Sequence, residues 1–362
     1  MENKKFNLSD WFKTKLEKNQ ESLEIFNNTL NARKAELKTQ LAKIKDDSHL
    51  LVPILNGLHG HTMSEKGHKA LINMSFRYQS RDISIEKLKE FYDFSKYNGT
   101  VIIFIHGLMN DESIWKSKPG NRKKWLGSAI EDEMKANALY VRYNTGRHIS
   151  ENGRQLSSLL QHFIEVHQSI NQLNIVCHSM GGLVSRSACY YSGIHNQSWT
   201  GILKKVFLIG VPNEGSYLAR VAYMTQYFFR KIDPSENDSV AKFFDVRSNG
   251  IKDLSFGYLV DEDWQNSKDG NVKNIQQTKV YPLPHVYYYL IAASVTEENE
   301  KNRIFTFFGD GLVEKKSALS DLFITNSMIS GKVNMKLFPR LNHLTLLESK
   351  EVFNYIKVGL DL

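Results

Sequence analysis

The chain has 362 residues, which is enough for one large α/β domain with insertions or for two smaller domains. Hydrophobic residues make up 41% of the chain and charged residues 24%, as in ordinary soluble proteins, and no apolar run approaches the roughly 18 residues that span a membrane. The formal net charge is +8. No helix-turn-helix, zinc knuckle or aromatic–basic RNA motif accompanies this charge, so we expect no nucleic-acid binding and a weak preference for anionic surfaces.

The beginning of the chain and its two cysteines indicate a compartment. The first ten residues lack the apolar core and the small-residue cleavage site of a secretory signal, so we expect a cytoplasmic protein, with residence at a membrane surface as the alternative. Cys177 should end a strand, and Cys189 lies in the expected next helix, about 14 Å further along. A disulfide needs Cα atoms within about 7 Å, so both thiols should be free.

Residues 9 to about 46 predict one long helix, and we assign residues 1–48 to an N-terminal amphipathic helical arm. Ser9 is a suitable N-cap, and apolar residues recur every seven positions after it. These residues are Leu16, Leu23, Leu30, Leu37 and Ile44. The partner heptad position is mostly polar, so the arm has one apolar stripe and not a full coiled-coil seam. The pattern favours an arm packed on its own domain; the alternative is self-association or partner binding through this helix.

Residues 49–362 predict one α/β domain, because short apolar runs typical of buried strands alternate with helical patterns. The expected strands cover residues 50–55, 70–78, 100–105, 138–143, 173–177, 205–209, 286–293, 304–307 and 335–338, and the expected helices cover 85–97, 125–135, 152–170 and 181–192. This alternation is typical of a doubly wound, mostly parallel sheet.

The alternation stops between about 216 and 284, where aromatic residues are frequent. We expect a cap or lid insertion there, over the carboxyl edge of the sheet. Residues 218–232 within it are amphipathic. They either pack the insertion's own core or form a lid whose apolar face receives an acyl chain.

The strongest functional signal lies at residues 177–182, directly after the apolar run 173–176. These residues read Cys177-His178-Ser179-Met180-Gly181-Gly182. A strand that turns sharply through a serine into a helix is a nucleophile elbow, which exposes the serine hydroxyl at the carboxyl edge of a parallel sheet. The alternative is an ordinary glycine-rich turn that happens to contain a serine.

A serine hydroxyl becomes a nucleophile only when a base takes its proton and a third group orients that base. Asp310 lies in a glycine-flanked turn, and His343 lies between an expected strand and an expected last helix. The order Ser179, Asp310, His343 along the chain is the one expected for a nucleophile elbow with its acid and base. Taken singly, Asp310 could be a turn aspartate and His343 a residue near a helix N-terminus.

The oxyanion of such a reaction needs backbone donors. One should be the N–H of Met180, the residue after the nucleophile, and the other should come from the turn after strand 100–105. There we expect the Leu108 N–H to be the donor, with the Met109 N–H as the alternative. His106, in the same turn, should position the turn and not act as a base.

At these motifs the chain resembles the serine lipases and esterases of the α/β-hydrolase superfamily, nearest the branch of bacterial lipases and GPI inositol-deacylases. The similar segments are residues 105–108, 177–182, 211–216, 309–313 and 342–344, within about 100–350. The resemblance implies an α/β-hydrolase fold, nucleophile Ser179, acid Asp310, base His343, and oxyanion donors Leu108 and Met180. The chain departs from the family pattern with Cys177 in place of glycine and with Asn213 and Glu214 in the segment that shapes the rim of the site; His178 we regard as a packing residue.

We therefore expect hydrolysis of carboxylic esters, preferably of lipids because of the apolar insertion. The alternatives are a thioesterase or acyltransferase with the same residues, or a non-catalytic interaction scaffold. We expect no cofactor, since there is no glycine-rich nucleotide motif, and no metal, since the acidic run 261–263 lacks the glycine of a calcium loop. Basic residues after the oxyanion turn form either a solvated face or a docking site for anionic lipid. They are Lys116, Lys118, Arg122, Lys123 and Lys124.

Overall fold

The computed structural model describes residues 51–65, 67, 69–116, 125–134, 136–215, 248–265, 277–295, 310, 313, 315–324 and 331–360. All of them lie in one compact unit, Leu50–Leu362. The predicted helical arm of residues 1–48, most of the predicted insertion at 216–284 and the predicted strand at 304–307 lie outside the described residues.

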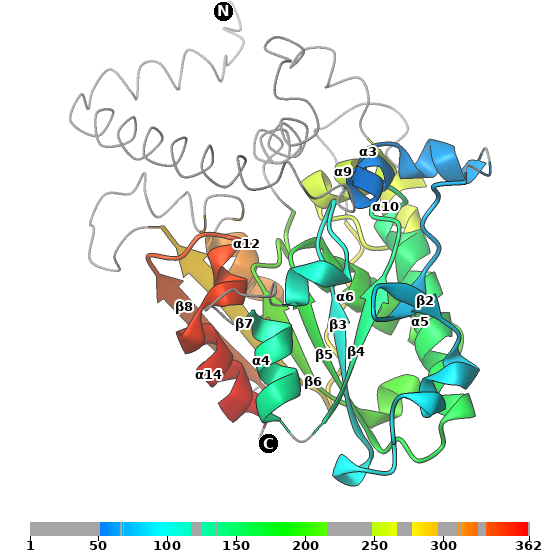
Figure 1. The fold of residues 1–362 in the computed structure, drawn as a ribbon. Coiled ribbons are helices and arrows are strands. Elements are labelled where there is room, and N and C mark those ends of the chain that lie inside the picture. Colours follow the sequence, from blue (N-terminus) through cyan, green and yellow to red (C-terminus); the bar gives the residue numbers. More distant parts are fainter. Residues whose placement is uncertain are drawn as a thin grey trace, which may run out of the picture. The chain divides into compact units, whose positions relative to one another are not determined.

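An eight-stranded sheet is the centre of the described structure (Figure 1). Its strands are β1 (Ser75–Tyr78), β2 (Arg81–Ile83), β3 (Thr100–Ile105), β4 (Asn137–Arg142), β5 (Gln172–His178), β6 (Leu203–Ile209), β7 (Tyr287–Ser294) and β8 (Val333–Pro339). Their order in the sheet is β2-β1-β4-β3-β5-β6-β7-β8. Strand β1 is antiparallel to both neighbours, whereas β4, β3, β5, β6, β7 and β8 pair in parallel.

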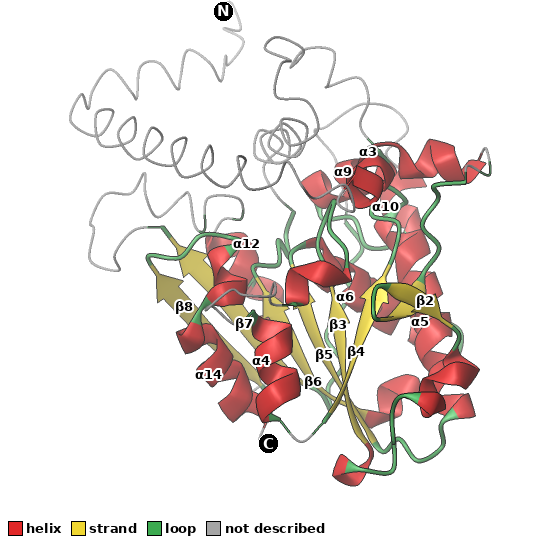
Figure 2. Ribbon diagram, viewed as in Figure 1, coloured by secondary structure: helices red, strands yellow, loops and turns green. Residues whose placement is uncertain are grey.

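Helices cover both faces of this sheet (Figure 2). One face carries α5 (Ile149–Val166) and α6 (Met180–Ile194), and the other carries α4 (Leu126–Glu133) and α14 (Lys350–Leu360). The remaining described α-helices are α3 (Leu51–Glu65), α9 (Asn249–Phe256), α10 (Asp261–Gln265), α12 (Lys315–Leu319) and α13 (Asp321–Ile324), and short 3₁₀ turns occur at η3 (Ile85–Glu90), η4 (Tyr97–Gly99), η5 (Glu112–Trp115), η6 (Trp199–Ile202) and η9 (Thr345–Glu348).

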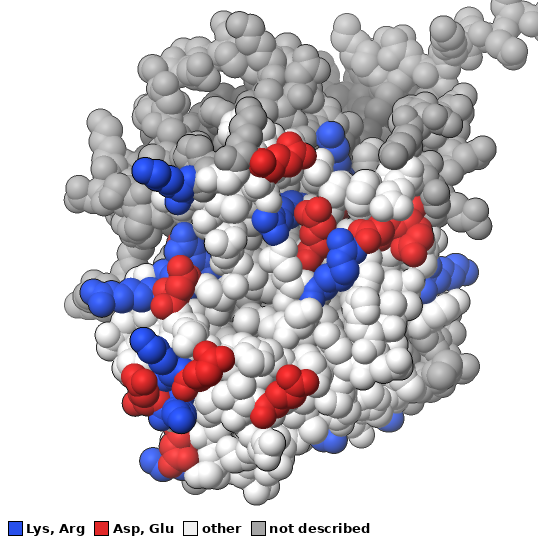
Figure 3. All heavy atoms as spheres, turned by 90° about the vertical axis from the view of Figure 1, so that its right-hand side faces the viewer, with Lys and Arg blue, Asp and Glu red and all other residues white. Residues whose placement is uncertain are grey.

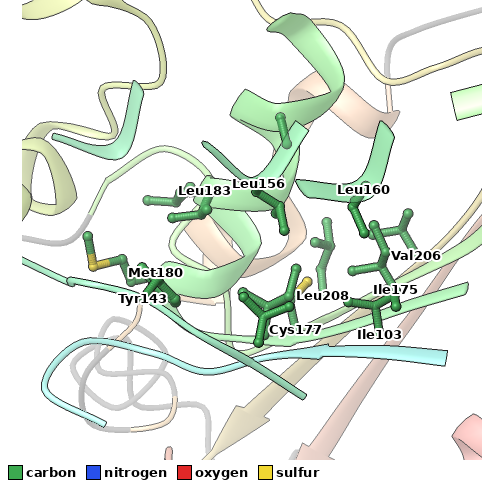
Figure 4. Packing of buried hydrophobic residues seen from close by; sticks show 14 of the residues in the cluster. Ile103, Tyr143, Leu156, Leu160, Ile175, Cys177, Met180, Leu183, Val206 and Leu208 are labelled. Atoms are coloured by element: carbon green, nitrogen blue, oxygen red, sulfur yellow. The ribbon is translucent and has the colours of Figure 1, made fainter. Parts of the chain in front are cut away.

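The two-residue period of a strand explains why both faces are apolar. In β3 every residue is buried; Ile103 and Ile105 pack toward α5 and α6, while Ile102 and Phe104 pack toward α4 and α14. Figure 4 shows the first of these layers, in which leucines of α5 and α6 lie over β3, β5 and β6. This packing fixes the strands whose carboxyl ends carry the predicted site.

The predicted strands from residue 100 onward are confirmed within two residues, apart from the one outside the described range, and the three helices from residue 125 onward are confirmed within about four. The predicted strand at 50–55 is wrong, because helix α3 begins at Leu51. A run of six mostly apolar residues fits a buried strand and a buried helix equally well, and here the helix continues through polar residues to Glu65. Strand 70–78 and helix 85–97 are shorter than predicted, forming β1 and η3.

The strand order places a topological switch at β3. The chain passes from β3 to β4 on one side and then crosses to β5 on the other, and the helices that follow β3 and β5, α4 and α6, lie on opposite faces of the sheet. Ligands of open α/β sheets bind at such switch points. A mostly parallel sheet in this order, with helices on both faces, is the predicted α/β-hydrolase fold.

Both cysteines are free thiols, as predicted. The Cys177 Sγ donates to the Phe207 carbonyl oxygen at 3.1 Å, and burial raises the pKa of this thiol to about 12. Cys177 therefore behaves as a small core residue. Among the described helices, none combines the length and hydropathy needed to cross a membrane.

Helix α6 begins in tight contact with the end of β3. A Cβ on Gly181 would lie 2.5 Å from the carbonyl oxygens of both Ile105 and His106, which is closer than side chains approach backbone. The first turn of α6 therefore requires glycine at this position.

We predict that Gly181→Ala lowers the free energy of unfolding by about 1–3 kcal/mol, because the added methyl group must displace backbone. Gly193→Ala in the same helix is the matched control, since a Cβ there meets nothing within 4 Å; it should be neutral or stabilising by up to about 1 kcal/mol. Urea unfolding of both variants measures the difference, and equal effects would contradict the contact.

Candidate active site

Ser179 lies at the turn between β5, which ends at His178, and α6, which begins at Met180. Its backbone has φ 54° and ψ −127°, a conformation that costs an L-residue roughly 1–3 kcal/mol and persists only where the surroundings impose it. The Ser179 N–H donates to the Ile209 carbonyl oxygen at 2.9 Å, which ties the turn to the end of β6. This is the geometry of the predicted nucleophile elbow.

His343 and Asp310 form a buried pair. The His343 Nδ1 lies 2.7 Å from the Asp310 Oδ2, the His343 backbone N–H donates to the Asp310 carbonyl oxygen at 3.2 Å, and the two residues are 3% and 2% exposed. Asp310 Oδ1 also accepts the Val313 N–H at 2.7 Å. A carboxylate at Nδ1 keeps the proton on that nitrogen and leaves Nε2 as the base. Nε2 is buried and finds no hydrogen-bond partner in the described part of the chain.

Gly210 shows that this pair lies beside the elbow. It follows Ile209, the acceptor of the Ser179 N–H, and has φ 57°. A Cβ at Gly210 would lie 3.1 Å from the His343 Nδ1 and 3.2 Å from the Asp310 Oδ2. Residues 310 and 343, far apart from Ser179 in the sequence, therefore lie beside the residue that follows the acceptor of the Ser179 N–H, at the carboxyl end of β6.

The backbone N–H groups of the two predicted oxyanion donors, Leu108 and Met180, differ from that of the alternative donor, Met109. Met109 has φ 56°, and its N–H donates to the Thr145 Oγ1 at 3.1 Å, so this group is occupied. The Leu108 N–H and the Met180 N–H meet no acceptor among the described residues. Met180 is the first residue of α6, where N–H groups have no partner within the helix. A Cβ at Gly107 would lie 2.9 Å from the Ser179 Cβ, so the turn adjoins the serine.

His106 is packed beneath this turn. Its Nδ1 lies 2.9 Å from the Gly107 carbonyl oxygen, and its ring stacks on Tyr143 with centroids 4.4 Å apart. The Tyr143 hydroxyl donates to the His106 carbonyl oxygen at 2.8 Å. Burial lowers the pKa of His106 to about 4, so the ring is neutral. These contacts suit a residue that positions the turn.

Sequence reasoning missed two supports of residues 106–109, the turn after β3. One is Thr145, in the loop after β4. The other is α3, whose Gly57 lies directly against the Met109 side chain and whose Gly60 carbonyl oxygen accepts from the Asn144 Nδ2 at 3.0 Å. Helix α3 packs beside α9 beyond the ends of β3 and β4 (Figure 1), and the Ser248 hydroxyl donates to the Gly57 carbonyl oxygen at 2.6 Å. Loops after parallel strands share one edge, a signal that could have indicated Thr145.

Asn213, in the segment predicted to shape the rim, and Asp261 and Asp263, in the acidic run, bond to other residues of the domain. Asn213 is buried, and Arg186 donates to both its backbone and its side-chain oxygen at 3.2 Å. Asp261 pairs with Arg154, and Asp263 accepts the N–H groups of Leu259 and Val260, the two residues that precede α10. Within the described ranges, no group of three or more His, Cys, Asp or Glu side chains is arranged to hold a metal ion.

Of the basic run after the oxyanion turn, Lys116 is described, and its Nζ lies 4.6 Å from the Tyr140 ring centroid. Lys118, Arg122, Lys123 and Lys124 lie outside the described residues. On the face drawn in Figure 3, acidic and basic side chains are interspersed.

Comparison with known proteins gives a sequence family and a set of solved structures. The family described as "Domain of unknown function (DUF7379)" matches residues 72–233. No curated protein matches the chain. The chain is similar to the mature lipase BlEst2 of Bacillus licheniformis, with 17% identity, 72% of this chain and 90% of that chain covered, and a TM-score of 0.45. It is also similar to the esterase PF2001 of Pyrococcus furiosus, with 12% identity, 72% and 81% covered, and a TM-score of 0.44.

We predict that the neutral buried histidines make the fold acid-sensitive. Burial lowers the pKa of His106 to about 4 and that of His178 well below its usual value. Below pH about 6.5 the unfolded chain binds protons at these rings and the folded chain does not, so the free energy of unfolding falls by up to about 1.4 kcal/mol per pH unit for each. Urea unfolding between pH 7 and pH 5 measures this slope.

His106→Asn should make that slope shallower. The matched substitution is His195→Asn, at an exposed histidine, which should leave that slope unchanged. The same slope in wild type and His106→Asn would be evidence against a neutral buried ring.

Proposed function

We propose that this protein is a serine hydrolase that cleaves carboxylic esters through an acyl-Ser179 intermediate. The observation that carries the proposal is the left-handed backbone of Ser179, at the same end of the sheet as a His343 ring whose Nδ1 is held by Asp310 at 2.7 Å. A strained serine, a buried imidazole with a free Nε2 and a carboxylate orienter are the parts that nucleophilic acyl transfer requires.

In the acylation half, the His343 Nε2 takes the Ser179 hydroxyl proton as Oγ attacks the ester carbonyl carbon. The oxyanion that forms accepts hydrogen bonds from the Leu108 and Met180 N–H groups, each of which is worth about 3 kcal/mol in comparable sites. The His343 imidazolium then gives its proton to the alcohol oxygen, and the alcohol leaves. Water repeats the sequence on the acyl-enzyme and releases the carboxylic acid.

Among esters we favour those of lipids, on the strength of the aromatic-rich insertion predicted at residues 216–284. The resemblance to bacterial lipases and GPI inositol-deacylases points the same way. Contact with anionic membranes and self-association through residues 1–48 are further predictions from the sequence.

Ser179→Ala should lower kcat on p-nitrophenyl butyrate by at least about 10⁴-fold and abolish labelling by a fluorophosphonate probe, because the nucleophile is lost. Asp310→Asn should lower kcat by about 10³–10⁴-fold while the variant stays folded. Ser192→Ala is the matched control, since Ser192 lies near the other end of α6 and bonds the Gln197 carbonyl oxygen. Labelling that does not depend on Ser179 would leave the scaffold alternative standing.

A series of p-nitrophenyl esters from acetate to palmitate tests the substrate class. For a lipid esterase, kcat/KM should rise by about tenfold or more from C2 to C8, as each buried methylene adds up to about 0.8 kcal/mol. A steady fall from C2 onward would exclude a lipid acyl chain as the preferred substrate.

A further inference from the structure

Three histidines lie in the segments that form the candidate site, and the proposed reaction uses one of them, His343. His106 directly follows β3, and His178 directly precedes Ser179 at the end of β5. Each of the three has a buried ring nitrogen with no hydrogen-bond partner among the described residues. His178 directly precedes the nucleophile and is 1% exposed. Its contacts reach the two other loops of the site.

The first contact of His178 joins it to the loop of the base. Its Nε2 lies 3.0 Å from the backbone carbonyl oxygen of His343. A carbonyl oxygen only accepts, so Nε2 carries the proton and Nδ1 is the unprotonated nitrogen. The two imidazole rings are also in contact, with centroids 4.5 Å apart and planes tilted by 45°.

The second contact of His178 faces the oxyanion turn. A Cβ at Gly107 would lie 3.3 Å from the His178 Nδ1, so this edge of the ring rests against the backbone next to Leu108. The ring of Trp115, in η5, meets the His178 ring edge-on with centroids 6.5 Å apart. The side chain of His178 therefore lies between the turn that would stabilise the oxyanion and the loop that carries the base.

We propose that His178 is a positioning residue that holds the backbone carbonyl group of His343 in register with Ser179, whereas Asp310 holds the side chain and the backbone N–H of His343. The inference rests on the proposed function, because it assigns a role within the same site. Asp310 binds the His343 Nδ1 and the His343 backbone N–H, and His178 binds the His343 carbonyl oxygen. Because His178 directly precedes Ser179, its hydrogen bond to His343 links the backbone of the proposed nucleophile to the backbone of the proposed base.

The charge state of His178 suits this role. Burial, together with the neighbouring His343, holds the pKa of His178 well below its usual value. The imidazoles of His343 and His106 also lower that pKa, whereas the hydrogen bond to the His343 carbonyl oxygen raises it; burial is the largest of these effects. A neutral His178 keeps its Nε2–H donor while His343 becomes an imidazolium, and it adds no second positive charge beside it.

Two variants separate positioning from packing. His178→Phe keeps a planar ring but removes the donor to the His343 carbonyl oxygen, and His178→Gln keeps an N–H donor at about the same distance from the backbone. On p-nitrophenyl butyrate, Phe should lower kcat by about 10–100-fold with KM within about threefold of wild type, because a base displaced by about 1 Å loses that much. Gln should restore kcat to within about fivefold.

A packing role predicts the opposite order, with Phe close to wild type and Gln impaired. Wild-type labelling by the fluorophosphonate probe distinguishes the two failures. An unlabelled wild type would sink the proposed function and this inference with it, whereas a labelled wild type matched by its Phe variant would sink the inference alone.

A measurement on the wild-type protein covers the case in which either variant fails to fold. In the full chain labelled with ¹⁵N-histidine, the ring nitrogen shifts of His178 should show the proton on Nε2 and should not titrate between pH 5.5 and pH 8. A proton on Nδ1, or a titration within that range, overturns the inference.

Discussion

The site depends on one backbone constraint, the left-handed conformation of Ser179 between β5 and α6. A turn this tight brings the start of α6 against the carbonyl groups at the end of β3, which only glycine at position 181 allows. The strain of roughly 1–3 kcal/mol is offset by neighbouring bonds, among them the one from the Ser179 N–H to Ile209.

Hydrogen bonds hold the buried polar side chains around this turn. Asp310 receives hydrogen bonds on both carboxylate oxygens, as a buried carboxylate must. The imidazoles of His106 and His178 each bond a backbone carbonyl oxygen through one nitrogen and leave the second without a partner in the described structure. These hydrogen bonds fix the orientation of both rings.

Local sequence signals predicted most of what the structure contains. The six residues of the elbow and the apolar run of β3 are contiguous, so their periods and glycines are visible in the sequence. The meeting of Asp310 with His343 followed from chain order and resemblance, and its 2.7 Å contact agrees. The start of helix α3 was predicted as a strand, because six residues are too few to show whether apolar residues repeat with the period of a strand or of a helix. The contacts of Thr145 with Met109 and of His178 with His343 depend on segments that only the folded chain brings together.

Helix α3 is packed into the domain, although it lies upstream of the residues that match a known sequence family. The similarity to a known sequence family begins at residue 72, yet the backbone of the Met109 turn is folded against Gly57, and the Asn144 loop is bonded to Gly60. A fragment beginning at residue 72 would keep Ser179, Asp310 and His343 and would expose to water the apolar side of the turn that α3 covers. The folded unit that holds the candidate site therefore extends upstream of residue 72 and includes α3.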